Sequence, residues 1–113
     1  MLHITTREQW ERALAAGSYE ADSLAGEGFM HSSAPRQAVG VANRLFRGRH
    51  DLVLLVIDPA RVQAAIKHEP AGDGETYPHV YGPLNTDAVV QVLPFPPDSD
   101  GGFTLPPELA ARE

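Results

Sequence analysis

Six consecutive apolar residues, Leu52 to Ile57, constrain the fold of this chain more than any other segment. Asp51 precedes the run, and Asp58 and Pro59 follow it. An apolar run of this length between turn-forming residues is typical of a strand that is covered on both faces. We therefore predict a central strand here, with other elements packed against both sides of its sheet.

The segments around this run predict an interleaved set of helices and strands. Apolar residues at helical spacing predict one helix that starts at Thr5 or Thr6 and ends at Gly17. They predict a second helix that Ser32 or Ser33 caps and that ends at Gly48. Residues 18–28 are expected to be irregular. Further strands are expected at residues 2–5, 29–32, 66–69, 77–81 and 88–93.

This pattern favours an α+β fold, with mainly antiparallel, curved sheets and two principal helices. The length of 113 residues suits one domain, residues 1–113. Half of the ten prolines lie in the last twenty residues. We expect residues 94–109 to wrap around the body as extended chain and residues 110–113 to form a loose end.

Composition excludes several classes of function. Fifteen acidic residues against nine basic ones give a net charge of −6, so the basic surface that binds long nucleic acid is missing. The absence of cysteine excludes disulfides, thiolate catalysis and cysteine-bound zinc. No apolar run approaches the roughly 20 residues of a membrane span, and no signal segment is visible, so we expect a cytoplasmic protein without membrane contact. A monomer is favoured.

Four arginines, at positions 36, 44, 47 and 49, lie within fourteen residues. We interpret them as a solvated helix face and loop, although a local basic pocket is the alternative.

Three histidines lie in short segments that resemble one another. His3, His31 and His79 each stand among apolar or aromatic residues on an expected strand, next to hydroxyl-bearing side chains. A buried imidazole needs partners for both ring nitrogens, and it binds or transfers protons near neutral pH. The pattern therefore predicts a polar pocket in a β-rich scaffold.

His3 and Thr5 share one face of the first strand, because side chains on a strand alternate. Such a pair is suited to bind a ribose hydroxyl or an amide edge. The alternative is that Thr5 only caps the helix while His3 binds a backbone carbonyl.

The segment from Gly26 to Ser33 ends a strand at the start of a helix. Its glycines allow a close backbone approach, and a helix start with nearby hydroxyls binds anions. Ser32 and Ser33 are thus candidate anion or nucleotide ligands, with a helix cap and a structural histidine as the alternative. A nucleophilic Ser32 activated by His31 is a poor fit, since adjacent side chains point to opposite faces of a strand.

Tyr77, His79 and Tyr81 share one face if their segment is extended, and such aromatic faces sandwich flat rings. A rigid structural corner between prolines is the equal alternative. Glu27, Glu69 and Glu75 are candidate acids, and nothing in the sequence brings two of them together. No histidine pair has the spacing of a helical zinc motif, so we expect no metal site.

Together these segments resemble the domain-of-unknown-function family 952. The matching residues are His3 to Thr5, Trp10, Ala13, Gly17 to Tyr19, Ser23, Leu24, Glu27 to Ser33, Gln37, Val41, Ala42, Phe46, Leu52 to Asp58, Glu69, Pro78 to Leu84, Ala88 and Val89.

That family looks like the ADP-ribosyltransferase fold, in which two small antiparallel sheets flank a cleft that holds NAD. The resemblance implies that His3 and Thr5 contact a ribose. It also leads us to look for a late-strand glutamate, but His79 and Tyr81 occupy that position, which is similar to the RNA 2′-phosphotransferase branch of the fold.

The leading hypothesis is a domain that binds NAD, an ADP-ribosylated molecule or another nucleotide, with ADP-ribosyl or phosphoryl transfer as the activity that the resemblance implies. His31 and His79 are the candidate acid and base. The candidate ligand-binding residues are His3, Thr5, Phe29, Ser32, Ser33, Tyr77 and Tyr81. The alternatives are a non-catalytic module that binds a peptide or protein in the same cleft, and histidines that only rigidify the core.

Overall fold

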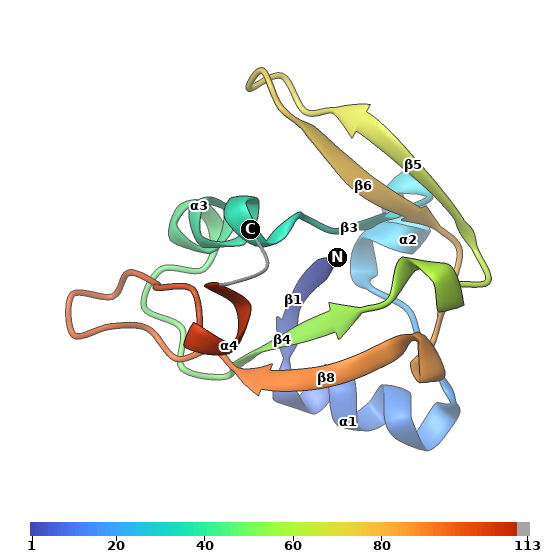
Figure 1. Cartoon of the computed structure of the whole chain (residues 1–113). Helices are drawn as coiled ribbons and strands as arrows, with labels where there is room; N and C mark the ends of the chain where they lie inside the picture. Colours follow the sequence, from blue (N-terminus) through green and yellow to red (C-terminus); the bar gives the residue numbers. More distant parts are fainter. Residues whose placement is uncertain (111–113) are drawn as a thin grey trace.

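The computed structural model describes residues 1–110, and eight strands and four α-helices lie in this part of the chain (Figure 1). The strands are β1 (Leu2–Thr6), β2 (Ser18–Tyr19), β3 (Met30–His31), β4 (Leu52–Ile57), β5 (Ala65–Pro70), β6 (Thr76–Tyr81), β7 (Leu84–Asn85) and β8 (Val89–Pro94). The helices are α1 (Arg7–Ala16), α2 (Asp22–Glu27), α3 (Pro35–Leu45) and α4 (Pro107–Ala110). Short 3₁₀ turns lie at Pro59–Arg61 and Thr86–Ala88.

Strand β4 is the centre of the molecule, as its apolar run predicts. It pairs antiparallel with β1 on one side and β8 on the other, and all six of its residues are buried. Leu52, Leu54 and Val56 face one apolar core, whereas alternate residues of the strand face a second core. Both cores therefore depend on one continuous apolar strand.

Two further antiparallel sheets complete the described part of the chain. The three-stranded sheet has the order β3-β6-β5, and β2 pairs with β7 over two residues. The prediction of an α+β fold with antiparallel sheets is confirmed. The expectation that residues 18–28 are irregular is wrong, since they contain β2 and α2, which are too short for an apolar period to appear in the sequence.

Helix α1 begins and ends where its sequence predicts. The Thr6 hydroxyl accepts a hydrogen bond from the Gln9 N–H at 3.1 Å, which satisfies an N–H group of the first turn. Gly17 ends the helix with a positive φ of 81°, a conformation that favours glycine.

Helix α3 departs from the prediction at both of its ends. Its N-cap is Ala34, not Ser32 or Ser33, and the Gln37 side chain accepts the Ala34 N–H at 2.9 Å. The helix ends at Leu45, three residues before Gly48. The two serine hydroxyls are consequently not used as helix caps.

The C-terminal segment packs against the body of the molecule. Phe95, Phe103 and Leu109 are buried in the core that also holds Leu54, and the Phe95 and Phe103 rings lie 4.8 Å apart. A single helical turn, α4, forms within the expected extended wrap. Most of the expected loose end, residues 111–113, lies outside the described residues. No helix within residues 1–110 is long and apolar enough to cross a membrane.

Candidate functional site

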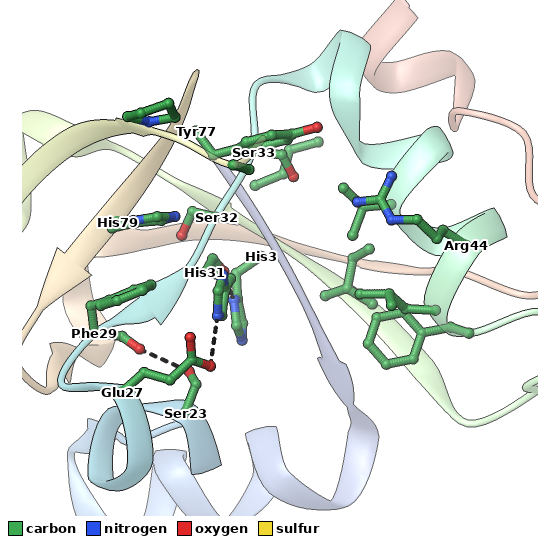
Figure 2. A pocket seen from close by; sticks show the side chains of 17 residues that line it. His3, Ser23, Glu27, Phe29, His31, Ser32, Ser33, Arg44, Tyr77 and His79 are labelled. Carbon is green, nitrogen blue, oxygen red and sulfur yellow. Dashed lines mark hydrogen bonds and ion pairs between the residues drawn. The ribbon is translucent and has the colours of Figure 1, made fainter. Parts of the chain in front are cut away.

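A cleft of about 550 Å³ lies between the β3-β6-β5 sheet on one side and β1 with α3 on the other (Figure 2). His3 from β1, His31 from β3 and His79 from β6 all line it. The His31 and His79 ring centroids are 5.3 Å apart. Three segments that are distant in the sequence thus bring their imidazoles to one cleft.

His3 is held at both ring nitrogens. Its Nδ1 lies 2.5 Å from the backbone oxygen of His31, so this nitrogen must carry a proton and donate it. Its Nε2 lies 2.8 Å from the Tyr19 hydroxyl. Burial lowers the pKa of His3 from 6.5 to about 4, so the ring is neutral at neutral pH.

A chain of hydroxyl groups continues behind His3. The Tyr19 hydroxyl lies 2.9 Å from Thr5 Oγ1, which in turn lies 2.8 Å from Gln9 Oε1. Each hydroxyl has one proton, so the direction of the chain depends on His3. A neutral His3 accepts a hydrogen bond from the Tyr19 hydroxyl, and Thr5 then donates either to Tyr19 or to Gln9. A protonated His3 donates to Tyr19, which lets Tyr19 donate to Thr5 and Thr5 donate to Gln9. Burial of the tyrosine hydroxyl raises its pKa, which keeps it protonated.

His31 and His79 each bind a carboxylate. His31 Nε2 lies 3.0 Å from Glu27 Oε1, and both side chains are more than half exposed. His79 Nδ1 lies 2.9 Å from Glu69 Oε1, and the His79 side chain is buried. A carboxylate on one ring nitrogen fixes the orientation of an imidazole and leaves the other nitrogen available.

Glu69 supports His79 from the neighbouring strand β5. Its Oε1 also accepts the Tyr81 hydroxyl. The hydrogen bonds from Tyr81 and then from His79 hold the pKa of the Glu69 carboxyl below its usual range, so it is ionised at neutral pH. The hydrogen bond from Tyr81 to Glu69 also raises the pKa of the Tyr81 hydroxyl.

An aromatic cluster forms one wall of the cleft. The Phe29 and His79 rings stack at 4.2 Å with 18° between their planes, and the Phe29 ring meets the edge of His31 at 5.0 Å. Such a wall offers a flat, partly apolar surface to a planar ring or to the carbon face of a sugar.

The opposite wall is apolar and has a cationic side chain. It is lined by Leu2, Ile4, Val41 and Phe46, and Arg44 lies beside them (Figure 2). Arg44 belongs to the arginine group interpreted above as a solvated face. Its three companions bind surface partners: Arg36 binds Glu75, Arg47 binds the Asp100 carbonyl and Arg49 binds Asp51.

The tip of the β5–β6 hairpin is tied to the start of α3. Glu75 Oε1 accepts hydrogen bonds from Arg36 at 2.7 Å and from the Gln37 amide at 2.8 Å. The Gln37 amide also donates to the Thr76 carbonyl at 2.9 Å. These contacts hold the hairpin tip beside the helix.

Seven of the nine residues expected in the site line the cleft, and two do not. Those that line it are His3, Phe29, His31, Ser32, Ser33, Tyr77 and His79. Thr5 lies behind His3 in the hydroxyl chain, and Tyr81 lies behind His79 on Glu69. Whether any of these residues contacts a ligand stays a prediction.

The carboxylates that contact His31 and His79 were not predicted from the sequence. Glu27 is four residues from His31, and this short spacing was the available signal for their contact. Glu69 and His79 are brought together by the register of the hairpin, which the sequence does not show. Within residues 1–110, no group of three or more histidine, aspartate or glutamate side chains is placed to hold a metal ion.

Residues 4–92 match the model of one protein family, described as a protein of unknown function (DUF952). The match spans well over half of the chain. The chain belongs to the DUF952 family. A search of curated proteins found none that matches it.

Solved structures resemble this DUF952 chain over nearly its whole length. Two crystal structures of the protein CC0527 from Caulobacter crescentus are 34% identical to it, with 96% of each chain covered and a TM-score of 0.88. The solution NMR structure of CC0527 is 33% identical, covers 97% of this chain and 96% of that chain, and has a TM-score of 0.83. The arrangement of strands and helices is therefore shared with CC0527.

Proposed function

We propose that this DUF952 protein binds a nucleotide, such as NAD, ADP-ribose or a nucleoside monophosphate, in the cleft between α3 and the β3-β6-β5 sheet. The observation that carries this proposal is the meeting of the three histidine segments in one cleft, next to the stacked Phe29 and His79 rings. A flat aromatic wall suits a base, and polar groups beside it suit a ribose.

Charge and size support the same ligand class. Arg44 provides a guanidinium for a phosphate group. A volume of about 550 Å³ lies within the range of small-molecule sites. The resemblance to the ADP-ribosyltransferase fold adds a reason to test NAD and ADP-ribose first.

For a transfer reaction, His31 and His79 are the proposed proton-transfer groups. Each has a carboxylate on one ring nitrogen, which orients the ring and leaves the other nitrogen free to face a ligand. His3 is not proposed as a proton donor, because both of its nitrogens are bonded and its pKa is lowered.

Isothermal titration calorimetry with NAD, ADP-ribose and AMP tests the binding. We expect Phe29→Ala to weaken binding about five- to 150-fold, since stacking of a base on an aromatic ring contributes about 1–3 kcal/mol. Val90→Ala is the matched control, because Val90 is half exposed on β8 and does not line the cleft. No heat at millimolar ligand, together with an unchanged melting temperature, would contradict the proposal.

A further inference from the structure

The Ser33 hydroxyl is an unused hydrogen-bonding group in the cleft. Ser33 lines the cleft and is only 4% exposed, and its hydroxyl has no partner within residues 1–110. Its oxygen nevertheless reaches the surface, because the neighbouring Ser32 Oγ is the sole fully buried side-chain nitrogen or oxygen in that part of the chain without a hydrogen bond. A nearly buried hydroxyl that keeps access to a cleft is suited to bind a ligand there.

Arg44 is a second unused group in the same cleft. It is exposed and lines the cleft from α3, and it forms no ion pair with a carboxylate in the described part of the chain. Arg36 and Arg49, by contrast, both bind carboxylates. Arg44 is therefore available to an anion that enters the cleft.

The Tyr77 hydroxyl lies near Arg44. It donates a hydrogen bond to Asp73 Oδ2 at 2.6 Å, and this bond raises the pKa of the hydroxyl. The Arg44 guanidinium counteracts this rise in pKa, so it faces Tyr77 across the cleft. Figure 2 shows Ser33 and Tyr77 at one end of the cleft, with Arg44 across from them.

The chemistry of the three groups selects a ligand. A guanidinium only donates hydrogen bonds, and the hydroxyls of serine and tyrosine are able to donate as well. A phosphate monoester offers three acceptor oxygens and about two negative charges at pH 7. We propose that Ser33, Tyr77 and Arg44 form the subsite for the 5′-phosphate of a nucleotide. The proposal rests on the nucleotide binding proposed above.

The aromatic wall adjoins this phosphate subsite. Tyr77 and His79 share one face of β6, because side chains on a strand alternate, and both line the cleft. Phe29 stacks on His79 at 4.2 Å. A nucleotide with its phosphate at Tyr77 therefore has its nucleoside part beside the Phe29 and His79 rings.

Asp73 is the group that a phosphate replaces on Tyr77. One hydroxyl proton serves one acceptor, so the Tyr77 hydroxyl leaves Asp73 when it donates to a phosphate oxygen. Asp73 is exposed at the hairpin tip, and its negative charge repels the incoming phosphate. The Asp73 carboxylate consequently limits the affinity of the subsite.

Calorimetry with AMP and adenosine tests the subsite. We expect the wild-type protein to bind AMP about tenfold more tightly than adenosine, as hydrogen bonds to a charged group imply. Arg44→Gln should bring this ratio close to one, and Ser33→Ala and Tyr77→Phe should each lower it about threefold. The affinity for adenosine should not change in the three variants.

Arg47→Gln is the matched control for the lost charge. Arg47 is also exposed near the end of α3, but it binds the Asp100 carbonyl and does not line the cleft. Its substitution should leave the preference for AMP unchanged. An equal loss of AMP affinity in Arg44→Gln and Arg47→Gln would reduce the effect to net charge and would overturn the subsite.

Asp73→Asn tests the exchange on Tyr77. Removal of the carboxylate charge should strengthen AMP binding about threefold and leave adenosine binding unchanged, since only AMP has a charge for Asp73 to repel. Weaker binding of AMP in this variant would contradict the exchange.

Melting curves of the unliganded protein provide a measurement that does not depend on any ligand. Because the Ser33 hydroxyl has no partner, Ser33→Ala should leave the melting temperature unchanged or raise it. Ser23→Ala is the comparison, since the Ser23 hydroxyl donates to the Phe29 carbonyl at 2.8 Å and its removal should lower the melting temperature. An equal decrease in Ser33→Ala would show that Ser33 has a structural role instead.

The remaining outcomes separate the two proposals. If AMP and adenosine bind with equal affinity and the three variants change neither, the phosphate subsite fails and nucleotide binding stands. If AMP, ADP-ribose and NAD all fail to bind, the proposed function fails, and inorganic phosphate is then titrated alone. Binding of phosphate that Arg44→Gln abolishes would retain the subsite for another phosphate ester, whereas no binding would overturn it as well.

Discussion

His3 shows how one side chain connects the interior of the protein to its cleft. One ring nitrogen holds the backbone of β3 and the other holds Tyr19, while the ring itself lines the cleft. A polar residue in this position is stable only while both hydrogen bonds are kept. His3 is therefore a structural support for the strand that carries His31.

Replacement of His3 by leucine should lower the free energy of unfolding by about 1–3 kcal/mol, because the His31 carbonyl and the Tyr19 hydroxyl lose a buried partner. Urea denaturation followed by circular dichroism measures this change. His50→Ala is the control, since His50 is exposed, and it should change the value by less than about 0.5 kcal/mol. Equal stability of the two variants would contradict the role of His3.

His3 should also make stability depend on pH. Its pKa is lowered from 6.5 to about 4 in the folded protein, so the unfolded chain binds the proton more tightly. Its contribution is complete above pH 6.5, declines as the pH falls from 6.5 to about 4, and is constant below that. The total loss is about 3 kcal/mol. The stability difference between wild type and His3→Leu should shrink over this range, and a constant difference would contradict the assignment.

At the scale of elements, the β5–β6 hairpin supplies the cleft with the His79 imidazole. Glu69 on β5 and His79 on β6 meet because the two strands pair in a fixed register. The contact of Glu75 with Arg36 and Gln37 then holds the hairpin tip against α3. The hairpin tip is thus fixed to α3.

Removal of the Glu75 carboxylate should loosen the hairpin tip without unfolding the protein. We expect Glu75→Ala to speed hydrogen exchange of amides in residues 70–77, with little change in global stability because the ion pair is partly exposed. Exchange followed by mass spectrometry or NMR checks this. Glu11→Ala, on the exposed face of α1, should leave exchange in the hairpin as it is in the wild type.

Helices and strands with strong local sequence signals were predicted correctly. Features that depend on contacts between residues distant in the sequence were not. The apolar run of β4, the Thr6 cap and the Gly17 stop of α1 were all readable from neighbouring residues. The α3 cap was not, because the N-cap residue Ala34 has no side-chain acceptor and its own N–H donates to the Gln37 side chain. Likewise, the convergence of His3, His31 and His79 was a hypothesis that only the tertiary arrangement could settle.

At the scale of the whole molecule, two cores share β4, and the C-terminal segment completes one of them. Phe95, Phe103 and Leu109 pack with Leu54 and Ala42. This segment connects to the α3–β4 loop as well, where the Gly48 N–H donates to the Gly101 carbonyl at 2.8 Å. The tail is therefore part of the folded body.

A chain that stops at Pro94 should fail to fold. It lacks three buried side chains that each contribute about 2 kcal/mol, which is a large share of the 5–15 kcal/mol stability of a typical domain. Circular dichroism should show a loss of the cooperative thermal transition, whereas a chain that stops at Ala110 should keep it. A cooperative transition in the shorter chain would show that the tail is dispensable.

The position of Leu109 in the core also affects how the protein forms during synthesis. The β4 strand is made near the middle of the chain, but the core on one of its faces lacks its last side chains until residue 109 has left the ribosome. Until then, the apolar face of β4 is incompletely covered and is open to contact with other chains. The core on this face of β4 can therefore be completed only after residue 109 has left the ribosome.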